Sequence, residues 1–358
     1  MEVIMKYTYR FPAVKGTQAK REYYISMVPL RLLLKLFPAE SDILLPEYRA
    51  QRRINELRIP EIKDYILKNR DSYVFSALSA SIDGEFQFIP FSSDDIGILE
   101  VDMESTFLIN DGQHRKAAIE TALEEDSSLS DETISIVLFR DDGLARSQQM
   151  FTDLNKHAVK TSNSLSTLYD VRDPVAVATR NVIEAVPFLN MYTDKERDIL
   201  GKNSSNLFTL NTIYKANQRI LHSKSCSDDE LSFLLNFWRL IANNICEWNE
   251  LVERTITKKA LRENYIVTLG ITIGAFGKLG RFFYDNPSYD MEKYLTKLKK
   301  INWLRTNKDW VNRSIRENGK VLNSDEAIGL TCSMIKQYIG LKLTKDEQAK
   351  EKTMQENN

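Results

Sequence analysis

The chain has little cysteine and no long hydrophobic run, and both shortages exclude classes of protein. Its 358 residues include three cysteines, Cys226, Cys246 and Cys332, which are widely separated and match no metal-ligand spacing. They indicate no disulfide framework, so we expect buried thiols in a reducing compartment. The first residues lack the continuous apolar core of a signal peptide, and we expect a cytoplasmic protein.

The most apolar stretch, residues 265–283, is too short to cross a membrane. It is free of charged residues only over residues 264–277, and Lys278 and Arg281 follow at once. A membrane span needs about 20 predominantly apolar residues. We therefore expect a core helix of a soluble protein and no membrane partner.

Positive charge is absent from one long segment and concentrated in another, although the net charge is only −1. Residues 71–113 contain no lysine or arginine but nine carboxylates, whereas residues 293–320 contain nine basic residues and two acidic ones. The average therefore conceals a separation of charge along the chain, and candidate partners have to be sought segment by segment.

Strand signals stop near residue 170. Before that point, strands are expected at 7–11, 21–28, 72–81, 85–90, 107–109 and 133–139, and helices at 29–37, 49–69, 115–123 and 144–156. After it, helices are expected at 175–186, 210–221, 228–249, 258–283, 291–298, 303–316 and 324–341. The pattern predicts an α+β domain with a mixed sheet over residues 1–170, an all-helical domain over 171–343, and a polar, disordered tail over 344–358.

A run of five residues between an expected strand and an expected helix has the chemistry of an anion site. It consists of Asp111, Gly112, Gln113, His114 and Arg115, and we call it the pentapeptide. Gly112 permits a tight turn that a side chain would block. The free N–H groups of the following helix, with the positive end of its dipole, suit an anion. His114 and Arg115 add donors, while Asp111 can cap the helix, orient a donor, or help to hold a metal ion that accompanies a nucleotide.

The same residues also fit a purely structural role. A strand, an Asp-Gly turn and a capped helix are common together, and one histidine beside them proves nothing. A phosphate held by Gln113, His114 and Arg115 would establish the functional alternative. An Arg115 that is salt-bridged to a carboxylate within the fold would make the motif structural.

Residues 107–123, which contain the pentapeptide, resemble the signature of the DGQHR-domain family. Residues 51–66, with Arg52 and Arg53, resemble that family's arginine-bearing helix, and residues 150–160, with Asn155, resemble its phenylalanine–asparagine helix. The resemblance covers roughly residues 20–170 and implies a fold similar to ParB and sulfiredoxin-like proteins. Length, motif order and the helical second half look most like the DndB family of DNA phosphorothioation (sulfur modification) systems.

The resemblance implies DNA binding and transcriptional repression of the modification gene cluster. It also implies a phosphate- or nucleotide-binding site in which the pentapeptide is joined by Arg52 or Arg53 and by Asn155. The implied partners are promoter DNA and other phosphorothioation proteins, and a homo-oligomer is left open. If the site is instead catalytic, as a nucleotide triphosphatase or nuclease, Asp111 and His114 are its candidate residues and a nucleotide with Mg²⁺ its cofactor. A scaffold for the modification machinery is the third hypothesis.

Two basic clusters in the helical half are candidate DNA contacts, because lysine and arginine neutralise phosphates. If residues 303–316 form a helix, Trp303 and Trp310 should share a buried face and the basic residues should be exposed. No helix-turn-helix or zinc-finger pattern is present, and a solvated charged face remains the alternative. The candidates are Lys299, Lys300, Arg305, Lys308, Arg313 and Arg316 in the first cluster, and Arg254, Lys258, Lys259 and Arg262 in the second.

Overall fold

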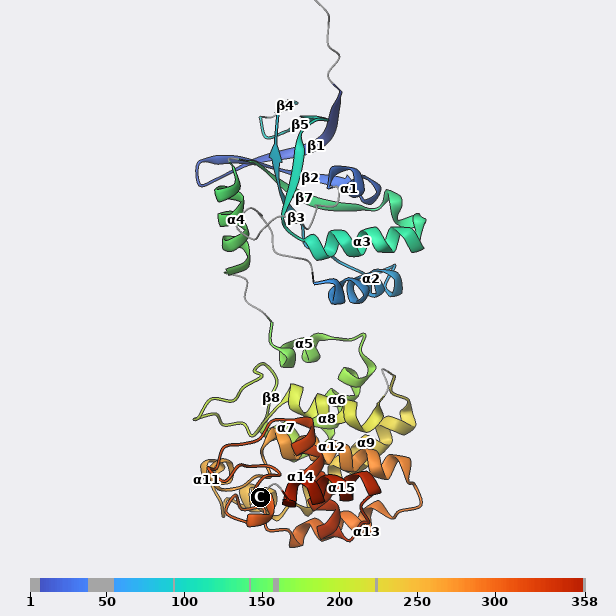
Figure 1. The fold of residues 1–358 in the computed structure, drawn as a ribbon, viewed down its shortest axis with the longest axis vertical. Helices are drawn as coiled ribbons and strands as arrows, with labels where there is room; N and C mark the ends of the chain where they lie inside the picture. Colours follow the sequence, from blue (N-terminus) through green and yellow to red (C-terminus); the bar gives the residue numbers. More distant parts are fainter. Residues whose placement is uncertain are drawn as a thin grey trace, which may run out of the picture. The chain divides into compact units, whose positions relative to one another are not determined.

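The computed structural model describes residues 7–37, 55–92, 94–141, 143–156, 161–222 and 225–356. The chain divides into two compact units, Met1–Val159 and Lys160–Asn358 (Figure 1). The expected arrangement, a mixed-sheet domain followed by a helical one, is confirmed in these terms. The division falls earlier than residue 170, because helix α5 (Asn163–Tyr169) packs against helices of the second unit.

The first unit is built on a seven-stranded mixed sheet with the order β4-β5-β1-β2-β7-β3-β6. Neighbouring strands are antiparallel except for β3 and β7, which run parallel. The strands are β1 (Thr8–Gln18), β2 (Arg21–Pro29), β3 (Leu78–Asp83), β4 (Phe86–Pro90), β5 (Ile96–Asp102), β6 (Thr106–Asp111) and β7 (Thr133–Arg140). The expected strand at 72–81 begins only at Leu78, and β5 had not been predicted.

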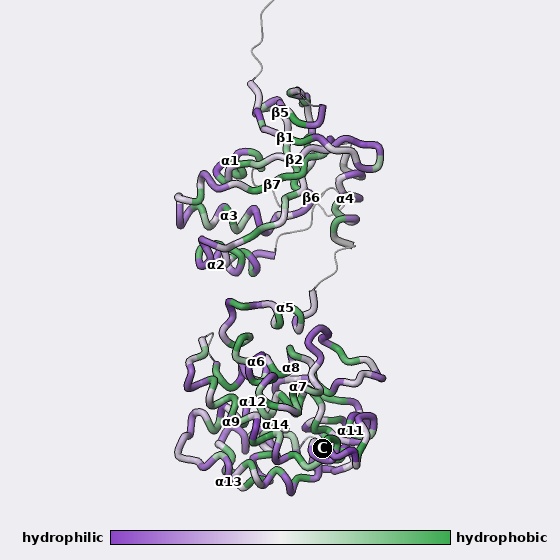
Figure 2. Tube along the Cα trace, turned by 180° about the vertical axis from the view of Figure 1, so that it is seen from behind, coloured by the Kyte–Doolittle hydropathy of each residue, from purple (hydrophilic) through white to green (hydrophobic). Residues whose placement is uncertain are grey.

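The two faces of this sheet are covered by different helices. One face carries the apolar core, which includes Leu78, Ile109 and Leu138 and to which α1 (Leu30–Leu36) and α3 (Gln113–Glu125) contribute. Helix α2 (Ile59–Lys68) packs beside α3, while α4 (Leu144–Lys156) lies on the other side of the sheet (Figure 1). Figure 2 shows hydrophobic residues, in green, along the strands of this sheet. The pentapeptide thus lies between β6 and α3 on the core side of the sheet, and α4 lies on its other side.

The second unit is helical apart from a short parallel pair, β8 (Thr193–Asp194) and β9 (Phe208–Thr209). Its core contains four fully buried tryptophans, Trp238, Trp248, Trp303 and Trp310. None of the helices in the described part of the chain is long and apolar enough to span a bilayer. Besides α5, the helices are α6 (Pro174–Ala185), α7 (Pro187–Tyr192), α8 (Leu210–Leu221), α9 (Asp228–Asn244), α10 (Cys246–Val252), α11 (Lys258–Asn264), α12 (Gly270–Asp285), α13 (Met291–Leu295), α14 (Asp325–Ile339) and α15 (Lys345–Glu356).

Helix 303–316 was predicted wrongly, although the burial of its tryptophans is confirmed. The rings of Trp303 and Trp310 stack in parallel with their centroids 5.4 Å apart. Residues seven apart in an α-helix are separated by about 10.5 Å along its axis, so a helix excludes this stack. The segment is irregular instead, with one 3₁₀ turn at Lys308–Trp310.

The helix expected at 258–283 is broken for a related reason. Between α11 and α12, Tyr265 is extended and a turn follows over residues 266–269. This stretch pairs with the irregular segment: Ile266 N–H donates to the Trp303 carbonyl (2.9 Å), and Arg305 N–H donates to the Asn264 carbonyl (2.8 Å). The expected helix 228–249 is likewise divided at Ile245, which is extended between α9 and α10.

The prediction of a disordered tail was also wrong, because residues 345–356 form α15. Glu351 is buried against Arg313 and accepts from its Nη2 (2.5 Å) and Nε (3.2 Å). Lys336 on α14 bonds Glu347 at 2.5 Å. The polar composition that predicted disorder therefore supplies buried ion pairs that hold this helix.

A carboxylate fixes the beginning of the second unit. Asp198 accepts from the backbone N–H groups of Asn163 and Ser164 (2.8 Å each) and from their side chains (2.8 and 3.0 Å). Burial alone would raise the pKa of Asp198, but these four hydrogen bonds outweigh it and lower the pKa below the ordinary value. The loop before β9 is thereby tied to the first turn of α5.

Candidate functional site

The pentapeptide forms the predicted junction between a strand and a helix. Strand β6 ends at Asp111, α3 begins at Gln113, and Gly112 between them is left-handed, with φ 106°. A Cβ atom at position 112 would lie 2.3 Å from Cδ2 of Leu78. Glycine is therefore required here both by the backbone conformation and by the close approach of β3.

Arg115 is bonded inside the fold. Its Nη2 pairs with the Asp111 carboxylate at 2.6 Å, and its Nη1 donates to the carbonyls of Ser76 (2.6 Å) and Ala77 (3.0 Å) and contacts the Ser76 hydroxyl. The side chain is 16% exposed. Arg115 thus ties the first turn of α3 to the segment that leads into β3, which is the geometry expected of a structural motif.

The other polar residues of the pentapeptide also face the protein. Nε2 of His114 accepts a hydrogen bond from the backbone N–H of Asn55 (3.0 Å), so that nitrogen carries a lone pair. Gln113 is buried, with 7% of its surface exposed. Arg52 and Arg53 lie outside the described residues, as does the side chain of Asn155, and their convergence on the pentapeptide stays a prediction.

Three of the predicted DNA contacts in the second unit are used within the fold. The expectation that Arg313 is exposed was wrong, because it is buried in its ion pair with Glu351. Arg305 donates to the carbonyls of Arg262 (2.8 Å) and Tyr265 (3.3 Å), and burial lowers the pKa of its guanidinium. Arg262 in turn donates to the carbonyl of Gly201 at 3.0 Å.

The other seven candidates are exposed, and the described structure gives none of them an ion pair. We call them the basic set; they are Arg254, Lys258, Lys259, Lys299, Lys300, Lys308 and Arg316. Its two parts lie on neighbouring segments, because Tyr265 after α11 forms a β-bridge with Leu304.

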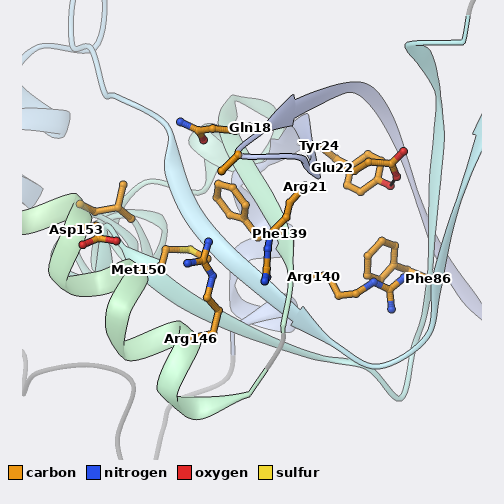
Figure 3. Close-up of a pocket in the computed structure, with 12 residues that line it drawn as sticks. Gln18, Arg21, Glu22, Tyr24, Phe86, Phe139, Arg140, Arg146, Met150 and Asp153 are labelled. Carbon is orange, nitrogen blue, oxygen red and sulfur yellow. Dashed lines mark hydrogen bonds between the residues drawn. The ribbon is translucent and has the colours of Figure 1, made fainter.

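A cavity in the first unit was not foreseen from the sequence. It lies where the β1–β2 turn, the end of β7 and α4 meet, and three arginines line it: Arg21, Arg140 and Arg146 (Figure 3). Arg140 and Arg146 come from consecutive elements, β7 and α4, but Arg21 begins β2, far earlier in the chain, so no local motif marks the three together. Within the described residues, no group of three or more histidine, cysteine, aspartate or glutamate side chains is placed to hold a metal ion.

The fold thus defines a protein with a mixed-sheet unit followed by a helical unit that carries exposed cations with no ion pair to any described residue. Residues 11–342 match the family model of DndB, which is described as DNA-sulfur modification-associated. The match extends over both units, and the chain belongs to this family. The protein therefore has a role in a DNA sulfur modification system. Neither a curated protein nor a solved structure matched the chain.

Proposed function

We propose that the protein is a DNA-binding regulator of a DNA phosphorothioate modification system and represses the modification gene cluster. Family membership supports the link to DNA sulfur modification. The observation that carries the DNA-binding part is the basic set in the helical unit, which is exposed and has no ion pair in the described structure. Cations that are not neutralised by the protein's own carboxylates are free to displace counterions from phosphates.

The proposal assigns DNA contacts to the helical unit, since the side chains of the pentapeptide make contacts within the fold. Arg115 is paired with Asp111, and Gln113 is buried. By contrast, Lys258 and Lys259 stand in the first turn of α11, and Lys299 and Lys300 end a 3₁₀ helix. The two lysine pairs belong to segments joined by backbone pairing, so one duplex can contact both.

The test measures affinity of the full-length protein for duplex DNA as a function of salt. Fluorescence anisotropy with the promoter region of its own gene cluster is compared with a scrambled duplex of equal length. Each phosphate contact contributes about 0.9 to the slope of log K against log salt. Replacing Lys258 and Lys259 together by alanine should therefore lower the slope by about 1–2 units, and so should replacing Lys299 and Lys300.

The matched control removes two charges elsewhere in the same unit. Lys345 and Lys352 lie on α15, where Lys352 is paired with Glu356 at 3.6 Å, and their double alanine variant should keep the wild-type slope. If both test variants bind like the control, the basic set is not the DNA surface. Equal affinity for promoter and scrambled duplex would remove the repressor part of the proposal while leaving DNA binding intact.

A further inference from the structure

The cavity beside α4 has the size and the lining of a ligand site. Its volume is about 660 Å³, within the range of about 300–1,000 Å³ common for small-molecule sites. Figure 3 shows Arg146, Met150 and Asp153 on α4 and, across the cavity, Phe139 and Arg21 from the sheet. Met150 and Tyr24 are buried in its walls. The cavity is thus formed by one helix and by strands of the sheet.

Within the described residues, the acidic side chains that line the cavity form no ion pair with Arg140 or Arg146. Glu22 is held by the Tyr24 hydroxyl (2.9 Å) and by Lys15 (3.7 Å). Asp153 accepts from the Gln149 amide at 2.7 Å. Neither Arg140 nor Arg146 has an ion pair in the described part of the chain. Two guanidinium groups are therefore left to bind an anion from solution.

One of these guanidinium groups is held in position before any ligand arrives. Arg140 stacks on the ring of Phe86, with its central carbon 4.3 Å from the ring centroid. Stacking uses the face of the guanidinium and leaves its N–H edge for hydrogen bonds. A planar fork of N–H donors matches the oxygens of a phosphate.

Flat apolar surface lies next to the charges. Phe139 stacks with Tyr23 at a centroid distance of 5.8 Å and an interplanar angle of 27°, and it lines the cavity together with Met150 and Leu154. An aromatic ring beside arginines suits a ligand that joins a planar base to a phosphate. A bare inorganic anion would leave this apolar wall unused.

We propose that this cavity binds a nucleoside phosphate, with Arg140 and Arg146 on the phosphate and Phe139 against the base. The ligand is either a free nucleotide or one residue of a single-stranded nucleic acid, since both present the same groups. The cavity lies in the first unit and the basic set in the second, so this site can be lost while duplex binding persists.

The test titrates the full-length protein with two probes, ATP by calorimetry and a short fluorescein-labelled single-stranded oligonucleotide by anisotropy. Arg146→Ala should lower the affinity for the probe that binds by about ten-fold or more, which corresponds to the loss of one hydrogen bond to a charged group. Phe139→Leu keeps an apolar side chain and should lower the affinity by about five-fold or more, because stacking is lost. Binding of ATP identifies a free nucleotide, and binding of the oligonucleotide alone identifies a strand.

Arg10→Ala is the matched control, because Arg10 is an exposed arginine of the same sheet, is paired with Glu100 at 2.8 Å, and does not line the cavity. It should bind like the wild type. Arg146→Gln serves as a second variant should the alanine variant fail to give the wild-type circular dichroism spectrum. The proposal is overturned if neither probe binds, or if a probe binds and the Arg146 and Phe139 variants match Arg10→Ala. It is also overturned if His114→Ala, and not Arg146→Ala, abolishes binding.

Discussion

Replacing Arg115 by alanine tests whether the pentapeptide has a structural role or binds a ligand. The guanidinium joins Asp111, Ser76 and Ala77, and its side chain is 16% exposed. If these contacts are its role, the variant loses stability. If its role is to bind a phosphate, the variant loses affinity and keeps or gains stability.

The expected magnitude follows from what the substitution leaves behind. Breaking a buried ion pair by removing one partner costs about 3–5 kcal/mol. Asp111 is 42% exposed and becomes hydrated once its partner is gone, which reduces that figure. The carbonyls of Ser76 and Ala77 also lose a charged donor, at about 1.5–3 kcal/mol for each such bond when buried. We expect a net loss of about 3 kcal/mol in the free energy of unfolding, and a melting temperature lower by about 6–12 °C for a unit of this size.

The assay is urea and thermal unfolding of the full chain, followed by intrinsic fluorescence and circular dichroism. Lys68→Ala is the control, since Lys68 makes an exposed pair with Asp64 at the same i, i+4 spacing, where the expected loss is only about 0.3–0.5 kcal/mol. The structural role of Arg115 is refuted if its variant unfolds like the control and at the same time loses affinity for duplex DNA or for ATP.

Three further substitutions, with Gly143→Ala as a comparison, test the fold of the two units. Gly112→Ala should cost about 2–3 kcal/mol in unfolding experiments, whereas Gly143→Ala, at a similar φ of 101° but with nothing within 4 Å of its Cβ, should cost only about 1 kcal/mol; equal losses would remove the steric argument. Glu351→Ala leaves Arg313 buried without its partner and should lower stability by about 3 kcal/mol and expose α15 to limited proteolysis, so an unchanged digestion pattern would contradict it. Because the pKa of Asp198 is lowered in the folded state, its carboxylate stabilises the protein above the ordinary pKa of about 4 and loses this effect as the pH falls through the lowered value. Asp198→Asn should cost about 1 kcal/mol at pH 7 and flatten the acid limb of a stability–pH profile; an unchanged acid limb would exclude this carboxylate as its source.

Local patterns predicted the elements whose backbone conformation follows from their own residues. The alternation of β7 and the helical period and boundaries of α4 and α8 could be taken directly from the sequence. The failures occurred where a distant segment determines the backbone. Residues 265–269 lie in an apolar stretch that was predicted to be helical, but the N–H of Ile266 donates to the Trp303 carbonyl and the helix ends at Asn264. Periodicity carries no information about such pairing.

The same limit applies to the sites. The pentapeptide and its glycine turn were predictable, because a strand, a left-handed residue and a helix are consecutive. The partners of Arg115 were not, since Ser76 lies 39 residues away in a segment that was predicted to be a strand. The cavity depends on the register that brings the β1–β2 turn, the end of β7 and α4 together. Alternation indicates which face a residue occupies but not which strand ends meet.

Arginine and lysine have different uses in this chain, and the difference bears on the proposed DNA contacts. Arginines repeatedly donate to backbone carbonyls in loops and at helix ends, which suits a planar group with five donors. Among the lysines, Lys297 makes such a bond, to the carbonyl of Ile339 (2.8 Å). The arginines that donate to carbonyls include Arg115, Arg180, Arg219, Arg262, Arg281, Arg305 and Arg313. The basic set is mostly lysine, which acts on phosphate as a point charge, whereas bidentate contacts to guanine favour arginine. Within the basic set, base recognition should therefore fall to Arg254 and Arg316, and the lysines should supply affinity that is independent of sequence.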